Sequence, residues 1–330
     1  MRKVKIAQIG TSAYSHGNFI WNSITKQSDV FEVVGYAFPE NEREKFPDAM
    51  KYYDGYREMT VEEILQDSSI EAVAIETEEI YLTKYAMMAA KAGKHIHMEK
   101  PGGRELQEFE ALIALLKEQG KVFHIGYMYR YNPYVMELMR QIENGELGEI
   151  TSVEAQMSCT HGKPVREWFG TFKGGNLFFL GCHLIDIIYR IQGEPKNIIP
   201  LSRSTGLDGL NTEDFGMAVL EYEHGVSFAK VNATEKGGYL RRQLVVTGSK
   251  ATVELKPFEI TVGCGHQSQR TYYDSGNWNQ EGTQTMTEIF DRYDGMMRAF
   301  AGYVLGESEN PYTLDYELEL YRLILKCCGE

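Results

Sequence analysis

The chain has 330 residues and a mass of 37.7 kDa, which is too long for one ordinary domain core and suits two domains. Hydrophobic residues make up 43% of the chain and charged residues 25%, as in water-soluble globular proteins, which disfavours disorder, collagen and coiled coil. The 34 basic and 47 acidic residues give a net charge of −13, and a surface of that sign repels phosphate backbones and anionic lipid. Nucleic acid and membrane partners are therefore disfavoured.

The first third of the chain alternates between short β-branched runs and helical patterns. The runs predict strands at residues 4–9, 31–37, 72–75, 95–98 and 122–125, and the helical patterns cover residues 80–92 and 106–116. Strands that alternate with helices through short links predict βαβ units, and hence a parallel sheet with helices on both faces. We therefore expect a doubly wound, Rossmann-type nucleotide-binding domain over residues 1–125.

After Gly126 the predicted strands follow one another, at residues 151–158, 215–222, 226–234, 241–247 and 251–255. Tight-turn signals at residues 223–225 and 248–249 predict hairpins, and helical patterns lie at residues 133–143, 183–191, 286–305 and 314–328. We expect residues 196–214 and 264–285 to be loops. The second domain, residues 126–330, is thus predicted as an α/β domain with a large open, mostly antiparallel sheet, whose helix 314–328 is the element that could pack back on the first domain.

Three features predict a cytoplasmic protein. No apolar stretch approaches the roughly 20 residues that span a bilayer. The basic start of the chain reaches a turn glycine after a few apolar residues, so it is typical of a strand rather than a secretory signal. The cysteines are odd in number and form no Cys-x-x-Cys pair, which favours reduced thiols: Cys159, Cys182, Cys264, Cys327 and Cys328.

The loop after the first strand lies where a dinucleotide fold places the pyrophosphate on a helix N-terminus. It begins Gly10-Thr11-Ser12 and continues to Ser15 before a helix opens. Ser12 and Ser15 stand where a Gly-x-Gly-x-x-Gly loop has its second and third glycines, so the motif is degenerate. Their hydroxyls can donate to phosphate, and Ser15 can cap the helix. A strand-to-helix turn without a ligand is the alternative interpretation.

The end of the second predicted strand lacks the carboxylate that binds the ribose 2′-hydroxyl of NAD. Phe38 stands there and cannot accept that hydrogen bond. Arg43, a few residues later, could meet a 2′-phosphate instead, although a solvated surface charge is the commoner role of such an arginine.

The sharpest local motif is the strand at residues 95–98 followed by Glu99-Lys100-Pro101. It ends on the ligand side of a parallel sheet, where a lysine beside dry surfaces can serve as proton donor, proton acceptor or hydroxyl clamp. His95 and His97 share a strand face, but no second pair has metal-ligand spacing, so a structural role is favoured over zinc and we predict no metal site.

The second domain carries its own polar candidates. His183 and Asp186 are spaced i, i+3 and so share a helix face, which makes His183 a candidate acid or base; a buried structural histidine is the alternative. Tyr127 and Arg130 belong to an aromatic cluster that suits a sugar, whose C–H faces stack on rings, while interdomain packing is equally compatible. Trp168 precedes the His183 helix and is a further candidate.

Taken together, these segments resemble the glucose–fructose oxidoreductase / inositol dehydrogenase / rhizopine catabolism (Gfo/Idh/MocA) family. The resemblance covers nearly the whole chain, in order and spacing, and rests on residues 6–10, 92–101, 130–133, 145–150 and 181–186. It implies a Rossmann domain followed by an α/β domain whose open sheet commonly forms a dimer or tetramer face. It also implies NAD(P)-dependent oxidation or reduction of sugars, cyclitols and related polyols.

The resemblance also implies roles for individual residues. Lys100 matches the lysine that contacts the reacting hydroxyl and the nicotinamide ribose, and His183 matches the histidine that accepts the proton. The implied cofactor contacts are Gly10, Thr11, Ser12, Ser15, Phe38, Thr77, Glu99, Lys100 and Pro101. The implied substrate contacts are Tyr127, Arg130, Trp168, Phe179 and Asp186.

Several positions depart from the family pattern. Phe179 replaces the aspartate four residues before the histidine, and Glu78-Glu79 follow Thr77 where the family commonly has Pro-Asn. Each lost polar contact is worth about 1 kcal/mol, so NAD or NADP binding is expected to be weakened or lost.

The sequence therefore leaves more than one function open. The leading hypothesis is that Lys100 and His183 flank the carbinol of a sugar-like substrate in a cleft between the domains, with hydride transfer to a nicotinamide. The alternatives are a non-redox relative, namely an NAD-assisted glycoside hydrolase or lyase, and a cofactor-free carbohydrate-binding or regulatory protein. An open sheet face predicts a homodimer or homotetramer.

Overall fold

The computed structural model describes residues 2–330 and divides them into two compact units. The first unit runs up to Met128 and also includes Tyr293–Tyr321; the second consists of Tyr129–Arg292 and Arg322–Glu330. The sequence analysis drew one boundary at residue 125 and assigned everything after it to the second domain. In the structure, Tyr293–Tyr321 belong with the first unit instead.

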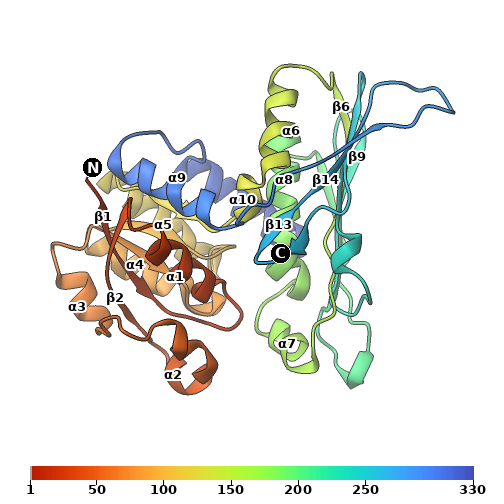
Figure 1. The fold of residues 1–330 in the computed structure, drawn as a ribbon. Coiled ribbons are helices and arrows are strands. Elements are labelled where there is room, and N and C mark those ends of the chain that lie inside the picture. Colours follow the sequence, from red (N-terminus) through yellow and green to blue (C-terminus); the bar gives the residue numbers. More distant parts are fainter. Residues whose placement is uncertain (1) are drawn as a thin grey trace. The chain divides into compact units, whose positions relative to one another are not determined.

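The first unit is built on a five-stranded parallel sheet in the order β2-β1-β3-β4-β5 (Figure 1). Its strands are β1 (Val4–Ile9), β2 (Phe31–Ala37), β3 (Ala72–Ile75), β4 (His95–Met98) and β5 (Phe123–Ile125). The strand order reverses at β1, and all neighbours are parallel. The predicted doubly wound sheet and its five strands are confirmed.

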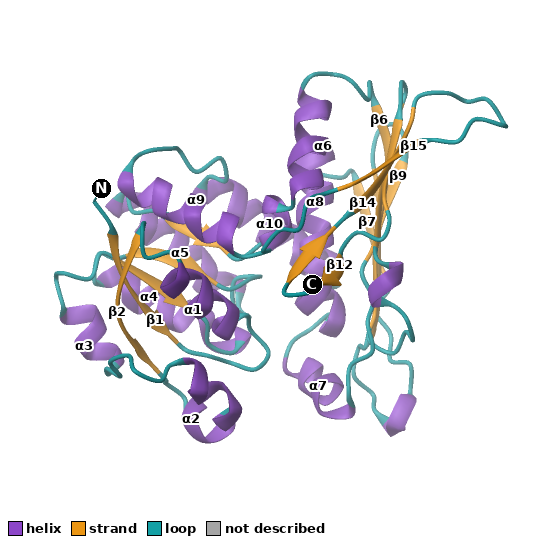
Figure 2. Ribbon diagram, in the orientation of Figure 1, coloured by secondary structure: helices purple, strands orange, loops and turns teal. Residues whose placement is uncertain are grey.

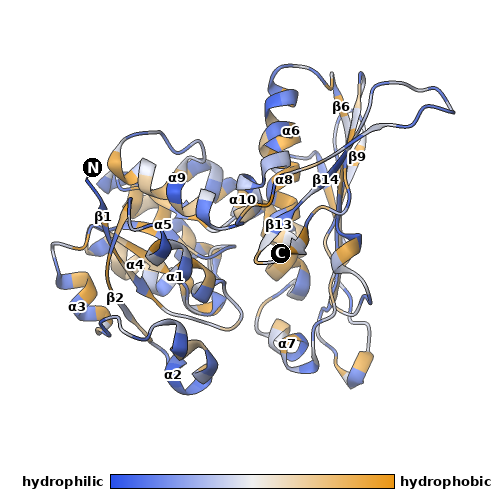
Figure 3. Ribbon diagram, viewed as in Figure 1, coloured by the Kyte–Doolittle hydropathy of each residue, from blue (hydrophilic) through white to orange (hydrophobic). Residues whose placement is uncertain are grey.

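The helices of this unit are α1 (Gly17–Lys26), α2 (Glu42–Lys45), α3 (Val61–Gln66), α4 (Leu82–Lys91), α5 (Leu106–Gln119) and α9 (Asp294–Leu305). The central strands bury nearly every side chain because helices cover both sheet faces, and their apolar residues are orange in Figure 3. Helix α9 joins from far along the chain: Ser23 of α1 donates to Asp294 at 2.9 Å, and the ring of Phe300 stacks on His124 of β5.

The second unit contains an eight-stranded sheet in the order β15-β14-β11-β10-β6-β9-β8-β7. The strands are β6 (Ile150–Gln156), β7 (Asn197–Pro200), β8 (Phe215–Glu221), β9 (Val226–Asn232), β10 (Gln243–Gly248), β11 (Thr252–Leu255), β14 (Gln269–Tyr273) and β15 (Thr283–Met286). Every neighbouring pair is antiparallel except β6 and β9, which are parallel. The prediction of a large, mostly antiparallel sheet is confirmed. A small separate hairpin pairs β12 (Ile260–Val262) with β13 (Gly265–Gln267).

Helices cover one face of this sheet. They are α6 (Pro133–Glu143), α7 (Lys163–Trp168) and α8 (Cys182–Gln192), of which α8 packs along β6 and β9 (Figure 2). Strands β8 to β11 alternate buried with half-buried residues, as expected of a sheet covered on one side. The last helix, α10 (Leu314–Cys327), contributes residues to both units.

The prediction of loops at residues 196–214 and 264–285 was wrong in part. Strand β7 lies in the first segment, and β13 and β14 lie in the second, with β15 beginning just before its end. All four strands are short, with three to five residues each, and β7 and β15 lie at the two edges of the large sheet, where little apolar burial is needed once the backbone is paired. Because β15 takes residues 283–286 into the sheet, the following helix begins at Asp294 rather than at the predicted residue 286.

Candidate active site

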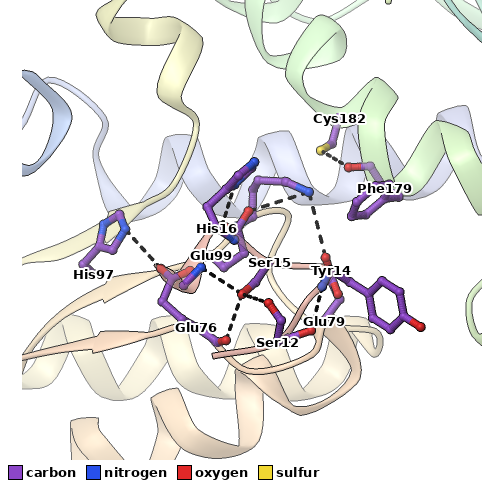
Figure 4. Close-up of polar contacts among 12 residues, drawn as sticks. Ser12, Tyr14, Ser15, His16, Glu76, Glu79, His97, Glu99, Phe179 and Cys182 are labelled. Atoms are coloured by element: carbon purple, nitrogen blue, oxygen red, sulfur yellow. Dashed lines mark hydrogen bonds and ion pairs between the residues drawn. The ribbon is translucent and has the colours of Figure 1, made fainter. Parts of the chain in front are cut away.

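The carboxyl ends of β1, β3 and β4 meet at one edge of the parallel sheet, as they must when neighbouring strands are parallel. This edge carries the loop from Gly10 to His16, the segment from Glu76 to Glu79, and the motif Glu99–Pro101. Figure 4 shows Ser15, His16, Glu76 and Glu99 from these three segments lying close to one another, with the ring of Tyr14 pointing away. The first unit therefore gathers most of the predicted cofactor residues at its ligand edge.

The loop after β1 keeps the backbone geometry of a nucleotide-binding turn. Gly10 has φ +94°, and a Cβ there would lie 2.6 Å from the backbone nitrogen of Thr77, so only glycine fits. Helix α1 opens at Gly17, whose N–H donates to Ser15 Oγ at 3.1 Å. Ser15 thus accepts the first N–H of the helix, but the N-cap residue is His16, so the expectation that Ser15 caps the helix was wrong. A turn of this kind followed by a helix N-terminus is suited to an anion.

Several N–H groups of this loop already have acceptors. Thr11 N–H donates to Glu42 Oε2 at 2.9 Å, and His16 N–H donates to Glu99 Oε2 at 3.3 Å. Within the loop, Ser12 N–H donates to the Glu76 carbonyl at 3.0 Å, and the N–H of residue 14 donates to Ser12 Oγ at 3.0 Å. Two carboxyl groups therefore lie where the sequence analysis expected phosphate oxygens.

A buried carboxyl cluster lies next to this loop. Glu76 and Glu79 have no exposed surface and Glu99 has 1%. Burial raises the pKa of Glu79 to about 8, and burial together with the charge of Glu99 raises the pKa of Glu76. Burial acts the same way on Glu99, but its interactions with His16 and with the Lys100 ammonium outweigh burial and lower its pKa to about 2. The cluster thus holds a carboxylate at Glu99 beside Glu79, which retains its proton near neutrality, and beside Glu76, whose pKa is raised.

Lys100 lies among these carboxyl groups and is only 1% exposed. Its Nζ is 3.6 Å from Glu99 Oε1 and 3.9 Å from Glu79 Oε1. Nδ1 of His16 lies 3.0 Å from Oε2 of Glu99, so this carboxylate lies between an ammonium and an imidazole. A buried ammonium with acidic neighbours on two sides is held in place and can exchange a proton.

The backbone shape of the loop suits a dinucleotide, but the acidic side chains beside the loop oppose its negative charge. The space at Gly10 and the N-terminus of α1 are what a pyrophosphate needs. The carboxyls of Glu42 and Glu99 on the loop N–H groups repel such an anion while they are charged. A dinucleotide therefore fits this loop when Glu42 is neutralised, since the charge of Glu99 is offset by the Lys100 ammonium 3.6 Å away.

Phe38 follows β2 and lies beside a pocket of about 470 Å³ within the first unit. The guanidinium of Arg43 lies 5.6 Å from the centre of the Phe38 ring and is paired with Glu58. Arg43 is therefore already ion-paired at the position where the sequence analysis considered a 2′-phosphate.

Two further predicted residues of this unit, Tyr127 and Pro101, are buried.

In the second unit, the predicted residues form two groups around the start of α8. His183 is 1% exposed, and its ring makes an edge contact with that of Tyr129 at 5.1 Å between centroids. A π-helical turn, Leu177–Gly181, precedes α8, an irregularity that is frequent at functional sites. Phe179 lies in this turn and makes an edge contact with Trp168 at 5.3 Å, so the residue that replaces the family aspartate belongs to an aromatic cluster.

Arg130 and Asp186 pair with each other. Arg130 Nη2 lies 2.8 Å from Asp186 Oδ1 and its Nε lies 3.0 Å from Oδ2, with both side chains nearly fully buried. This bidentate pair ties the segment before α6 to α8 and lies one helical turn after His183. The two residues therefore stabilise the structure through this pair, whatever their predicted role in substrate binding.

Sequence reasoning missed Glu42 and Glu76. A signal for Glu76 was present, since three carboxyls of the segment Glu76–Glu79 follow a buried strand at the ligand edge. No local signal marks Glu42, because its contact with Thr11 joins residues 31 positions apart. Among residues 2–330 no group of His, Cys, Asp and Glu is arranged to hold a metal ion, and no helix is long and apolar enough to cross a membrane.

The chain matches two family models. Residues 4–127 match the model described as an oxidoreductase family with an NAD-binding Rossmann fold, and residues 135–254 match the GFO/IDH/MocA C-terminal domain. The chain is 27% identical to the uncharacterized oxidoreductase ORF334 of Rhizobium meliloti, over 79% of this chain and 77% of that protein. It is 28% identical to IolW of Bacillus subtilis, a scyllo-inositol 2-dehydrogenase (NADP⁺), over 60% of this chain and 55% of that protein, so this match spans little more than half of the relative.

Among solved structures, the fold is similar to that of KijD10, a 3-ketoreductase from Actinomadura kijaniata in complex with NADP, with a TM-score of 0.80 and 18% identity. The alignment covers 98% of this chain and 96% of that one. The two matching models lie in the order that the sequence motifs predicted, and they confirm the oxidoreductase class and the NAD-binding Rossmann domain. The chain belongs to the Gfo/Idh/MocA family of oxidoreductases.

Proposed function

We propose that the protein oxidises or reduces a CH–OH group of a sugar, cyclitol or related polyol with NAD or NADP. The observation that supports this most is Lys100, a buried ammonium at the carboxyl end of β4, held between Glu79 and Glu99. A fixed cation at the ligand edge of an NAD-binding sheet can bind a hydroxyl and lower the cost of removing its proton.

Gly10, Thr11, Ser12, Ser15 and Thr77 would hold the dinucleotide in this proposal. When bound, its nicotinamide ring supplies the acceptor or donor of a hydride. Lys100 binds the reacting hydroxyl and His183 accepts the proton that leaves it. Phe179 and Trp168 present aromatic surface suited to the C–H face of a sugar ring.

A screen of polyols tests this proposal. The panel contains scyllo-inositol, which the name of the relative IolW suggests, together with other cyclitols and aldoses. Each is incubated with NAD⁺ and with NADP⁺ while the fluorescence of reduced nicotinamide is followed. We expect at least one member to give steady reduction. No reduction with any member, together with no dinucleotide binding, would overturn the proposal.

Glu79 is the proposed substitute for the acid that Phe179 has replaced. It lies 3.9 Å from Lys100, and burial holds its pKa near 8, so it carries a proton near neutrality and releases it at higher pH. Its charged form stabilises the protonated lysine and can take up a proton that passes through it. Glu79 is thus a positioning residue that acts through Lys100.

For Glu79→Gln we expect the pH profile of kcat/KM to change. In the wild type, kcat/KM for alcohol oxidation rises as pH passes through about 8, because Glu79 then ionises. The variant loses this rise and is about a hundredfold slower above that pH. Glu78→Gln, at the neighbouring position, serves as the control and should keep the rise. A Glu79→Gln enzyme with the wild-type profile would remove Glu79 from the mechanism.

We also propose that copies of the chain associate through the uncovered face of the eight-stranded sheet and work in a reducing, cytoplasmic compartment. The half-buried residues that alternate along β8 to β11 support the association, because a second copy that covers the open sheet face removes their side chains from water. The odd number of cysteines supports the reducing compartment.

A further inference from the structure

Glu42 occupies the loop that should receive the phosphates. It is the first residue of α2, has no exposed surface, and accepts the Thr11 N–H through Oε2 at 2.9 Å. Its other oxygen, Oε1, is buried and has no hydrogen-bond partner among the described residues. A buried carboxyl oxygen without a partner is costly, so this placement needs a reason beyond packing.

The chain before α2 is bent to bring Glu42 to this place. Glu40 and Asn41 both have left-handed backbones, with φ of 57° and 58°, which are uncommon for residues other than glycine. Two such residues in succession store strain of the kind found at functional sites. The strained turn and the partly unsatisfied carboxyl are independent observations on the same contact.

The contact itself resembles phosphate recognition. Thr11 supplies the first N–H after Gly10, in the turn that leads to the N-terminus of α1. Carboxylate and phosphate are both anions that accept through oxygen, and backbone N–H groups at such a turn bind either. Glu42 therefore makes the hydrogen bond that a phosphate oxygen would otherwise make.

Burial is the main influence on the charge of Glu42 and raises its pKa to about 8. The Thr11 N–H and the ammonium of Lys45 favour the charged form, whereas Glu78 and Glu40 oppose it. The other titratable groups that face it are Tyr53 and Tyr85, which stay neutral in this range because burial raises the pKa of each. Glu42 thus ionises as the pH rises through about 8, a range in which binding can be measured.

We infer that Glu42 is an internal anion that competes with the pyrophosphate of the dinucleotide for the loop, so that binding requires Glu42 to lose its charge. This inference rests on the proposed function, since it concerns the cofactor of that reaction. Protonated Glu42 presents an O–H that can donate to a phosphate oxygen, whereas ionised Glu42 repels it. Affinity for the dinucleotide should therefore fall as pH rises through the range in which Glu42 ionises.

The test is calorimetric titration with NAD⁺ and with ADP-ribose, which have no phosphate that titrates in this range, at about pH 7 and about pH 9. Wild-type affinity should fall by about tenfold between these values, since the group with a pKa near 8 is mostly neutral at the first and mostly charged at the second. Glu42→Gln should lose most of this fall, and should bind about tenfold more tightly than the wild type at the higher pH. Glu44→Gln, an exposed position on the same helix, is the matched control and should follow the wild type.

A second measurement needs no substitution. Titration of the wild type in two buffers of different ionisation enthalpy gives the protons taken up on binding, and we expect about one at the higher pH. Absence of proton uptake, or a Glu42→Gln protein with the wild-type pH dependence, would overturn the inference and leave the proposed function standing. Failure of wild type and variant alike to bind either ligand at millimolar concentration would overturn both.

Discussion

Replacing Lys100 by Met should lower kcat/KM by about a thousandfold or more while the protein remains folded. The substitution keeps the length and apolar stem of the side chain and removes the ammonium that lies 3.6 Å from Glu99 and 3.9 Å from Glu79. The reacting hydroxyl then has no fixed cation, and the Glu99 carboxylate repels the charge that develops when its proton leaves. Initial rates with a polyol from the panel measure the effect.

Lys91→Met is the control for this experiment. Lys91 is exposed at the end of α4, outside the carboxyl cluster, and its substitution should leave kcat/KM unchanged. Circular dichroism and thermal melting establish that both variants fold. A Lys100→Met enzyme that turns over within about tenfold of the wild type would show that the lysine is outside the mechanism.

Replacing Arg130 by Met should lower the free energy of unfolding by about 3–5 kcal/mol. The change removes a guanidinium that binds the buried Asp186 through two hydrogen bonds, at 2.8 and 3.0 Å. The cost follows more from the buried Asp186 carboxylate that loses these two hydrogen bonds than from the lost pair itself. Urea unfolding followed by circular dichroism measures the shift in midpoint.

Arg140→Met gives the matched comparison. Arg140 also pairs with a carboxylate, that of Glu137, but half of its side chain is exposed, so the expected loss is at most about 1 kcal/mol. Equal effects of the two substitutions would mean that the buried pair is no more important for stability than a surface one. The comparison therefore separates the effect of burial from that of charge pairing.

The strands of the first unit could be predicted from sequence because the signal is local. Buried parallel strands read as short β-branched runs, and the five predicted ranges agree with β1 to β5 to within one residue. Helix α6 was equally clear, since Asn132 caps it and Pro133 starts it. Edge strands such as β7 and β15 carry little apolar pattern, and the parallel pairing of β6 with β9 depends on contacts far apart in the chain. Those features could not be read from local pattern.

The candidate site divides in the same way. The turn at Gly10 and the motif around Lys100 follow predicted strands directly, so the sequence places both at the carboxyl edge of the sheet. The engagement of Thr11 by Glu42 could not be predicted, because it depends on a strained turn and on burial. Likewise, the pairing of Arg130 with Asp186 joins residues 56 positions apart, and the sequence analysis predicted that each of them contacts the substrate.

Transfer of deuterium tests the central claim most directly. A polyol from the panel that supports reduction is prepared with deuterium on its carbinol carbons, and the reduced dinucleotide is isolated and analysed by mass spectrometry. The account predicts one deuterium in each molecule of reduced dinucleotide, since hydride passes straight from the carbinol carbon. Reduced dinucleotide without deuterium, or no reduction by any polyol of the panel, would contradict it.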